Sequence, residues 1–304
     1  MIHNIEALEE TYQDFIIPEN AAFREFNLEI EGADGGWIEY TYLDRFGTNR
    51  TQRVNGGEGA TISATYTIGR NMGQIPPGST LRFIIGNRGS WAKFDLLSHG
   101  GYGTGGGGGT AVLLSKDGGS NWLILMVAGG GGGAGVDTEE IDTQFNPGMP
   151  GASGDEGMGK TNSRNEAMPS GNRGSGGQSN KNTGGGGGAY EDGIHETGTL
   201  HYGNAGWKGH KLSGQPLGGL GGTQKGGYNG GWGFGGGGSG AEGGGGGGGY
   251  SGGGAGAPGF GGEGGTSYVD RFTVSPSGVL RKQNDDTNNP EHGRARYQFG
   301  PAKQ

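Results

Sequence analysis

The segment from Gly154 to Thr161, Gly-Asp-Glu-Gly-Met-Gly-Lys-Thr, matches the G-x-x-x-x-G-K-[ST] pattern of phosphate-binding loops letter for letter. Such a loop binds phosphate when a strand leads into it and a helix follows, because backbone amides, helix dipole and Lys then converge on the phosphate. Neither neighbour is expected here, since Asn146-Pro-Gly-Met-Pro precedes the motif and a turn begins at Pro169. The acidic residues inside the motif would also repel a phosphate. We interpret the match as a chance product of abundant glycine and predict no nucleotide site.

Metal-binding and catalytic patterns are incomplete as well. His195 and His201 share a loop with acidic residues, but their spacing matches neither H-x-E-x-H nor a zincin helix. The acidic stretch at 137–142 lacks the D-x-D-x-D-G spacing of a calcium loop. The chain has no cysteine, and neither a Ser-His-carboxylate set nor a G-x-S-x-G elbow after a strand can be assembled. We therefore expect a non-enzymatic protein with no catalytic residue, metal site or cofactor.

One series of side chains could do recognition chemistry. Rigid aromatic rings on tightly held loops offer a large contact area at a small entropy cost, which suits binding of a protein or a glycan. Alternatively, most of these rings pack on a sandwich and close the ends of a glycine bundle, and only one or two bind. The tentative binding residues, all within a glycine-rich stretch, are Tyr202, Trp207, His210, Tyr228, Trp232 and Phe234.

The elements that would position these rings depend on how glycine is distributed. The chain has 304 residues, of which 81 are glycine, and only 29% are hydrophobic. Residues 1–100 contain 13 glycines, residues 101–265 contain 65 and residues 266–304 contain 3. The glycines form uneven runs and lack the strict three-residue period of collagen. The sequence therefore predicts an ordinary folded frame with a glycine-rich insertion.

The frame, residues 14–128 and 266–304, has the period-two alternation of half-buried β-strands. Phe26, Leu28 and Ile30 alternate with polar residues, and a similar alternation runs from 62 to 68. The apolar run 122–127 predicts a central buried strand. Only the stretch from Ile5 to Tyr12 looks helical, and we interpret residues 1–13 as a leader that docks elsewhere. Short strands separated by Gly, Pro and Asn turns predict an all-β, antiparallel sandwich.

The insertion, residues 129–265, contains long glycine runs, such as those at 129–133 and 243–249. A run of this kind is either a flexible linker or part of a bundle of left-handed polyglycine II helices, whose outward amides bond to neighbouring helices only where no Cβ blocks the approach. The bulky aromatic residues in the insertion favour the bundle. Within it, the polar, Pro-punctuated segment 137–182 predicts a long surface loop.

A series of anchors around the glycine runs resembles a known family. They follow one another along nearly the whole chain, as Leu28-Glu-Ile-Glu-Gly-Ala-Asp-Gly-Gly36, Pro76-Pro-Gly-Ser-Thr-Leu-Arg-Phe-Ile-Ile-Gly-Asn-Arg-Gly89, the pentaglycine before Thr110, Trp122-Leu-Ile-Leu-Met-Val-Ala-Gly, Gly230-Gly-Trp-Gly-Phe-Gly, and Gly264-Gly-Thr-Ser-Tyr268. This order resembles the glycine-rich extracellular domain of the anaplastic lymphoma kinase and leukocyte tyrosine kinase receptors, and stand-alone bacterial glycine-rich proteins. A looser similarity, in composition alone, is to polyglycine tail-fibre adhesins of bacteriophages.

The resemblance implies a TNF-like sandwich from which a polyglycine II bundle extends. Receptor signalling does not carry over, because the chain lacks cysteines, a kinase and a membrane span. An acidic balance, with a net charge of −8 and no basic stripe, argues against nucleic acid as a partner. We expect an adhesive or structural module of a surface appendage, phage-type tail or other extracellular assembly, contacting a protein or glycan ligand or neighbouring subunits. It would be extracellular, cell-surface or virion-associated without a conventional signal peptide. The alternative is a soluble, receptor-like ligand-binding module.

Overall fold

The protein is all-β in the part of the chain that the structure describes. The structure is a computed structural model, and its only helical element there is a 3-10 turn at Glu19–Ala21. The described residues are 2–7, 10–21, 24–43, 46–94, 101–137, 145–146, 167–180, 182–194, 206, 209, 216–223, 228–283 and 291–302.

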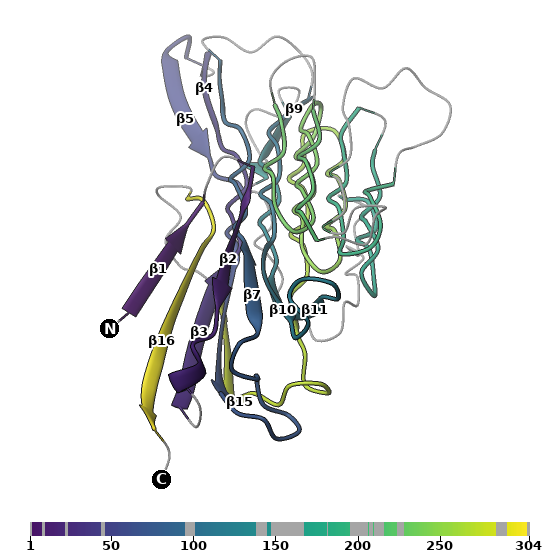
Figure 1. Cartoon of the computed structure of the whole chain (residues 1–304). Coiled ribbons are helices and arrows are strands. Elements are labelled where there is room, and N and C mark those ends of the chain that lie inside the picture. The colour runs from purple at the N-terminus through teal and green to yellow at the C-terminus, as the bar shows by residue number, and fades with distance from the viewer. Residues whose placement is uncertain are drawn as a thin grey trace.

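Two five-stranded antiparallel sheets form a sandwich-like arrangement (Figure 1). The first, here called the outer sheet, has the order β1 (Ile2–Glu6), β16 (Arg294–Ala302), β3 (Arg24–Glu31), β6 (Ala60–Thr67), β15 (Ser277–Gln283). The second, the inner sheet, has the order β14 (Tyr268–Val269), β11 (Leu123–Ala128), β10 (Thr110–Ser115), β7 (Thr80–Ile84), β2 (Tyr12–Ile16). The antiparallel sandwich expected from the strand pattern is thus confirmed at this level.

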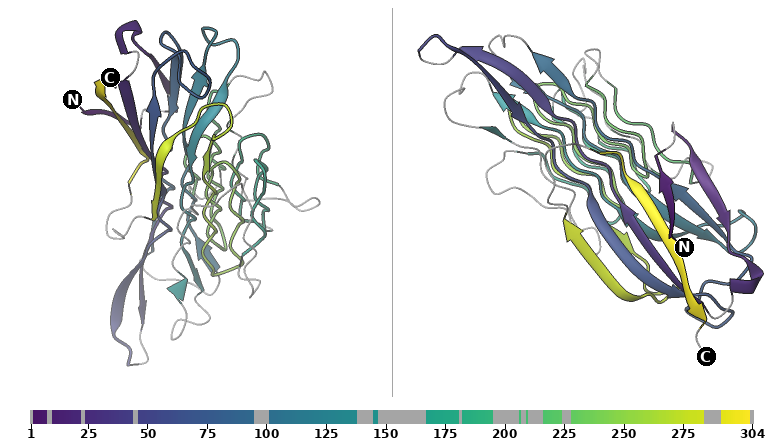
Figure 2. Two further views of the ribbon diagram at one scale, coloured as in Figure 1. Left: turned by 90° about the horizontal axis from the view of Figure 1, so that it is seen from below. Right: turned by 90° about the vertical axis from the view of Figure 1, so that its left-hand side faces the viewer.

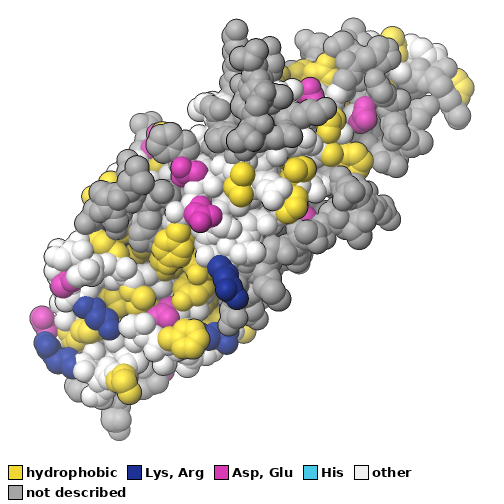
Figure 3. Space-filling model, turned by 90° about the vertical axis from the view of Figure 1, so that its right-hand side faces the viewer, with side chains coloured by type: hydrophobic (Ala, Val, Ile, Leu, Met, Phe, Trp, Pro, Cys, Tyr) yellow, Lys and Arg dark blue, Asp and Glu magenta, His cyan; other side chains and the backbone are white. Residues whose placement is uncertain are grey.

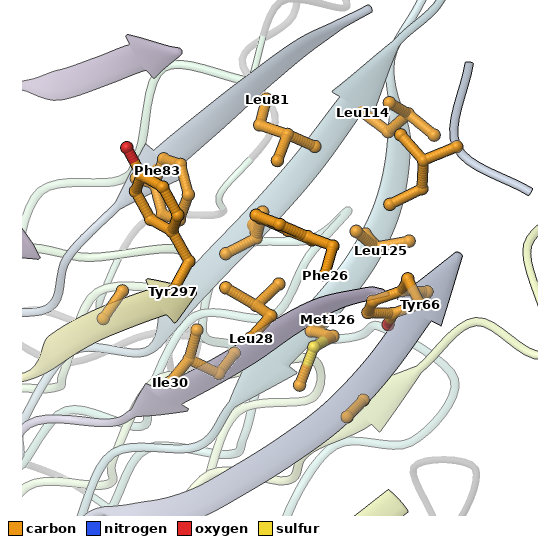
Figure 4. Packing of buried hydrophobic residues seen from close by; sticks show 14 of the residues in the cluster. Phe26, Leu28, Ile30, Tyr66, Leu81, Phe83, Leu114, Leu125, Met126 and Tyr297 are labelled. Carbon is orange, nitrogen blue, oxygen red and sulfur yellow. The ribbon is translucent and has the colours of Figure 1, made fainter. Parts of the chain in front are cut away.

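The main core lies between these two sheets. Phe26, Leu28 and Ile30 of β3 are buried, and they pack in one cluster with residues of β7, β10 and β11 from the other sheet (Figure 4). Successive side chains of a strand point to opposite faces, so the period-two pattern places every second residue in this core. The alternation predicted for β3 and β6 is confirmed.

The inner sheet is buried on both faces. All six residues of β10 are buried, as are five of the six residues of β11. One face contributes to the main core, and the other packs against Ala189, Trp232 and Phe234 of the glycine-rich part. The fully apolar run expected to be a central strand is β11, displaced by one residue from its predicted bounds.

The predicted helix is wrong wherever the structure describes it. Ile5 belongs to β1 and pairs with Ala295, and Tyr12 belongs to β2 and pairs with Ile84. This segment does not form a helix, because the edges of both sheets provide backbone hydrogen-bond partners for it. The predicted leader 1–13 therefore includes one strand of the sandwich and the start of another.

Two small sheets lie beyond the sandwich, at the end opposite the chain termini (Figure 1). Their shared core contains Ile38, Tyr40, Val54, Ala134 and Val136. One has the order β5 (Asn49–Val54), β4 (Ile38–Leu43), β8 (Ala92–Phe94), and the other the order β13 (Phe145–Asn146), β12 (Gly135–Asp137), β9 (Gly101–Gly103).

Glycine segments extend five strands of the sandwich toward these small sheets, so the glycine packing begins within the predicted frame. The segments 32–36, 55–59, 85–89, 105–109 and 129–133 adjoin β3, β6, β7, β10 and β11 respectively. They bond to one another, as from Gly35 N to Gly57 O at 2.8 Å and from Gly107 N to Gly131 O at 2.8 Å. Figure 2 shows strands and extensions as continuous paths.

The remaining glycine segments bond with a period of three. Along 244–250, every third N–H donates to the same neighbouring segment, and the three registers serve three different neighbours. The bonds, given as donor to acceptor residue, are 244 to 260, 247 to 263 and 250 to 266, then 245 to 104 and 248 to 107, then 246 to 184 and 249 to 187, at 2.8–3.3 Å.

Part of the predicted surface loop 137–182 lies inside this packing. Gly171 and Gly177 are buried, and Gly177 N donates to Gly186 O at 2.9 Å. The polar composition of this segment suggested a solvated loop, but its glycines and small serines let the backbone approach its neighbours closely. Residues 138–144 and 147–166 of the loop are outside the described residues.

Candidate functional site

The six predicted binding residues fall into three groups. Tyr202, Trp207 and His210 lie outside the described residues. Trp232 is 4% exposed and Phe234 is fully buried. Tyr228 is half-buried at the edge of the glycine-rich part.

Trp232 and Phe234 connect the glycine-rich part to the inner sheet. Both rings pack in one cluster with Ile84, Ala111 and Leu113. Their backbones take part as well, because Phe234 N donates to Gly109 O at 2.7 Å and Asn87 N donates to Trp232 O at 2.6 Å. These two rings therefore offer no ligand surface and have the packing role that the sequence left open.

Tyr228 marks the boundary between the glycine-rich part and the small sheets. Its ring lies 6.0 Å from that of Phe94 in β8, and Phe94 lies 4.7 Å from Tyr102 in β9. Loss of solvent around the phenol, with a smaller effect of nearby Tyr102, raises the pKa of Tyr228. The ring remains neutral at physiological pH and acts as an apolar contact with a polar tip.

An exposed aromatic stack lies beside Tyr228, and sequence reasoning missed it. Ser90 bonds through its N–H and its Oγ to the carbonyl of Asn229, at 2.9 and 2.6 Å. The next residue, Trp91, stacks on Trp37 with ring centroids 4.9 Å apart and an interplanar angle of 10°. The guanidinium of Arg53 lies 4.3 Å from the Trp37 ring centroid. We call Arg53, Trp37 and Trp91 the tryptophan stack.

Backbone pairing explains the stack. Trp37 precedes β4 and Trp91 precedes β8, and these two strands run parallel, with Ile38 opposite Ala92. A bond from Ala92 N to Trp37 O at 3.0 Å continues the pairing to the two tryptophans. Nothing in the local sequence relates positions 37 and 91, so only the pairing of distant strands could reveal the site.

The outer surface of the glycine-rich part has few chemical features (Figure 3). Much of the described surface there is backbone and uncharged polar side chains, and charged groups are scattered. Glycine exposes only peptide groups, which are already bonded to neighbouring segments.

Asp34 is a carboxyl group whose pKa lies clearly above its ordinary value. Its two carboxylate oxygens accept bonds from Gly59 N and Glu291 N, each at 2.8 Å. Loss of solvent outweighs these bonds and raises the pKa of Asp34 to about 6, with small contributions from Glu31 and Glu291. This carboxyl joins three segments at the base of the glycine extensions.

The raised pKa predicts that the contribution of Asp34 to stability falls as pH rises. The folded state binds the Asp34 proton more tightly than the unfolded state, so the stabilisation is complete below about pH 4 and is lost as pH passes 6. Relative to Asp34→Asn, the free energy of unfolding of the wild type should fall by about 2 kcal/mol between pH 4 and pH 7. Urea denaturation of both proteins across this range measures the difference. A difference that stays constant or grows with pH would contradict the prediction.

The sequence motifs of phosphate and metal chemistry, 154–161 with His195 and His201, lie outside the described residues. Within the described ranges, no group of three or more His, Asp and Glu side chains is placed to hold a metal ion. Nor does any helix there have the length and apolar character needed to cross a bilayer. No protein-family model matches the chain, and no curated protein matches its sequence.

Proposed function

We propose that this protein is a non-enzymatic structural and adhesive module of an extracellular assembly, such as a surface appendage or a phage-type tail. In this proposal a TNF-like sandwich carries a rigid bundle of polyglycine II helices, and the loops and sheets at the ends of the bundle contact a ligand or neighbouring subunits. The function follows from rigidity and presentation, so it needs no reactive group.

The observation that carries the proposal is the three-residue period of hydrogen bonds along 244–250. A polyglycine II helix has three residues per turn and no internal bonds, so its amides point outward in three directions. A bundle of such helices bonds in the pattern found here. Glycine loses more backbone entropy on folding than other residues, and the dense bonding between segments offsets that cost.

Such a bundle suits an exposed structural element. Its stability resides mainly in backbone bonds distributed over many segments, and the buried rings of Trp232 and Phe234 attach it to the sandwich. Proteases require a locally opened chain, and a segment bonded on three sides opens rarely. Persistence outside the cell follows from the same property.

Hydrogen exchange tests the rigid bundle. The amide protons of 245–249 are expected to exchange as slowly as those of β10, because each is bonded to another segment and lies in a buried stretch. Exchange measured by mass spectrometry on peptides covering both regions makes the comparison internal. Exchange of 245–249 within seconds, at the rate of a flexible glycine linker, would overturn the bundle.

Copurification from the native source tests the assembly. A structural module should copurify with a particle or appendage and be located on it by immunogold electron microscopy. A receptor-like, soluble module is the alternative, and the half-exposed Trp91 favours a binding role in either case. A protein found only as a free monomer at high concentration, and never on a particle, would leave the receptor-like module as the function.

A further inference from the structure

The outward face of the β5-β4-β8 sheet combines aromatic and polar side chains. Ile38 and Tyr40 of β4 point into the core of the small sheets and are buried, so Trp37 and Glu39 point to the opposite face. The strand register places Arg53 of β5 and Lys93 of β8 on either side of Glu39. The tryptophan stack and these charged groups therefore share one surface.

Trp91 is the outermost ring of the stack. Because β4 lies between β5 and β8, Arg53 and Trp91 reach Trp37 from opposite sides. Trp91 is 50% exposed, and β8 pairs with no second strand among the described residues. One ring face of Trp91 rests on Trp37, so the exposed half of this residue must come largely from its other face and its edges.

The open ring is held rigidly in place. Trp91 follows Ser90, whose N–H and Oγ are bonded to Asn229 O, and precedes Ala92, whose N–H is bonded to Trp37 O. A ring with its backbone fixed on both sides loses little entropy when a ligand contacts it. This arrangement is preorganised for binding.

Polar groups share this face of the sheet with the tryptophan stack, Glu39 and Lys93 on the β4 and β8 side and Arg53 on the far side of Trp37. Glu39 and Lys93 form an ion pair at 2.6 Å, and Arg53 Nε donates to Asn55 Oδ1 at 2.8 Å. These side chains can form hydrogen bonds to ligand hydroxyls in place of water, and their ion pair and hydrogen bond can stay intact. The charges of Glu39 and Lys93 cancel within their ion pair, which favours an uncharged ligand at this side of the stack.

We propose that the open face of Trp91 binds a pyranose ring of a neutral glycan, with hydroxyls of the sugar bonded to Glu39 and Lys93. One side of a pyranose presents C–H groups that lie flat on an indole ring, and its hydroxyls need hydrogen-bond partners at the ring edge. A stable protein partner would bury roughly 1,200 Å² or more, and the aromatic surface of the stack, on which Trp91 is 50% exposed, is far smaller than that. The assignment rests on the proposed function, because the glycan would be the ligand that the adhesive module binds.

Saturation-transfer NMR on the full chain tests the assignment. The probes are hexasaccharides of β-1,4-linked glucose, β-1,4-linked N-acetylglucosamine and α-1,4-linked glucose, with linear mannitol as a polyol that has no ring. Sugar C–H protons of at least one hexasaccharide should receive saturation, and mannitol should not. Trp91→Ala should weaken that binding at least tenfold, and Trp91→Tyr, which keeps a ring, should weaken it less than threefold.

Two further variants separate binding from folding. Glu39→Gln removes the charge but keeps an acceptor, so it should weaken binding a fewfold without changing the melting temperature. Phe272→Ala removes an 89% exposed ring from the loop after β14 and should leave binding unchanged. Absence of saturation with all three hexasaccharides, or equal binding by Trp91→Ala and wild type, would overturn the glycan site.

The outcomes also distinguish this site from the proposed function. Slow amide exchange in 245–249 together with no sugar binding would remove the glycan assignment alone. Sugar binding that depends on Trp91 together with rapid exchange would remove the rigid bundle alone. Loss of a copurifying protein in Trp91→Ala without any sugar signal would assign the surface to a protein partner and overturn the glycan site.

Discussion

Gly107→Ala is expected to destabilise the protein by more than about 4 kcal/mol, enough to prevent folding of a marginally stable domain. A methyl group at this position would overlap the backbone carbonyl of Ala33 and approach that of Asp34. Gly107 also donates to Gly131 O and accepts from Gly248 N, each at 2.8 Å. The obstacle is backbone on a bonded segment, so no rotation of a side chain can relieve it, and several bonds must break together.

Gly118→Ala is the matched control. No atom lies within 4 Å of the position of an added methyl, although the φ of +69° makes alanine somewhat strained. The expected cost is about 1 kcal/mol. Urea denaturation followed by circular dichroism compares the two variants, and the yield of soluble protein serves where Gly107→Ala does not fold. Equal stability of the two variants would show that close packing of glycine backbones is not what holds the structure.

Phe234→Ala is expected to cost about 3–5 kcal/mol, the range for removing a fully buried aromatic side chain. The ring lies between the inner sheet and the glycine-rich part. On the second side it packs so closely on Gly209 that a Cβ added to this glycine would overlap the ring. Its loss leaves a cavity at the attachment of the bundle. Limited proteolysis should therefore cut the variant within residues 184–265 before the sandwich is degraded.

Phe272→Ala supplies the same chemical change at an exposed site. Phe272 is 89% exposed, so its removal should change stability by less than about 0.5 kcal/mol. Thermal unfolding of both variants, with mass spectrometry of the proteolytic fragments, makes the comparison. If the two variants had the same melting temperature, Phe234 would not anchor the bundle.

The strands of the sandwich were predictable to the extent that local pattern specifies burial. Phe26, Leu28 and Ile30 alternate with polar residues because one face of β3 is solvated. Strict alternation of this kind fits few structures other than a half-buried strand. The segment around Ile5 was mispredicted as helical, since its spacing fits a helix while its place is decided by pairing with β16. Edge pairing of this kind depends on residues nearly 290 positions away and leaves no local signal.

The candidate site shows the same limit more strongly. Trp232 and Phe234 belong to a series that suggested binding, yet packing on the inner sheet buries both. Trp37 and Trp91 were not singled out, yet parallel pairing of β4 and β8 stacks them on the surface. The residue type shows only that an aromatic ring can pack in a core or bind a ligand. Its neighbours in the tertiary structure decide which of the two it does.

Glycine distribution left a linker and a close backbone packing open, and the aromatic residues of the insertion favoured the packing. A run without Cβ atoms has no side chains to bury, so it can be ordered only through its peptide groups. Period-two alternation predicted β3 and β6. Tertiary structure alone decided which segments bond to which, where the glycine packing begins within the strands, and which tryptophan remains open. The physical reason is that peptide groups are chemically the same in every residue, so their hydrogen bonds do not depend on sequence. The partners of a glycine segment therefore follow from the path of the whole chain.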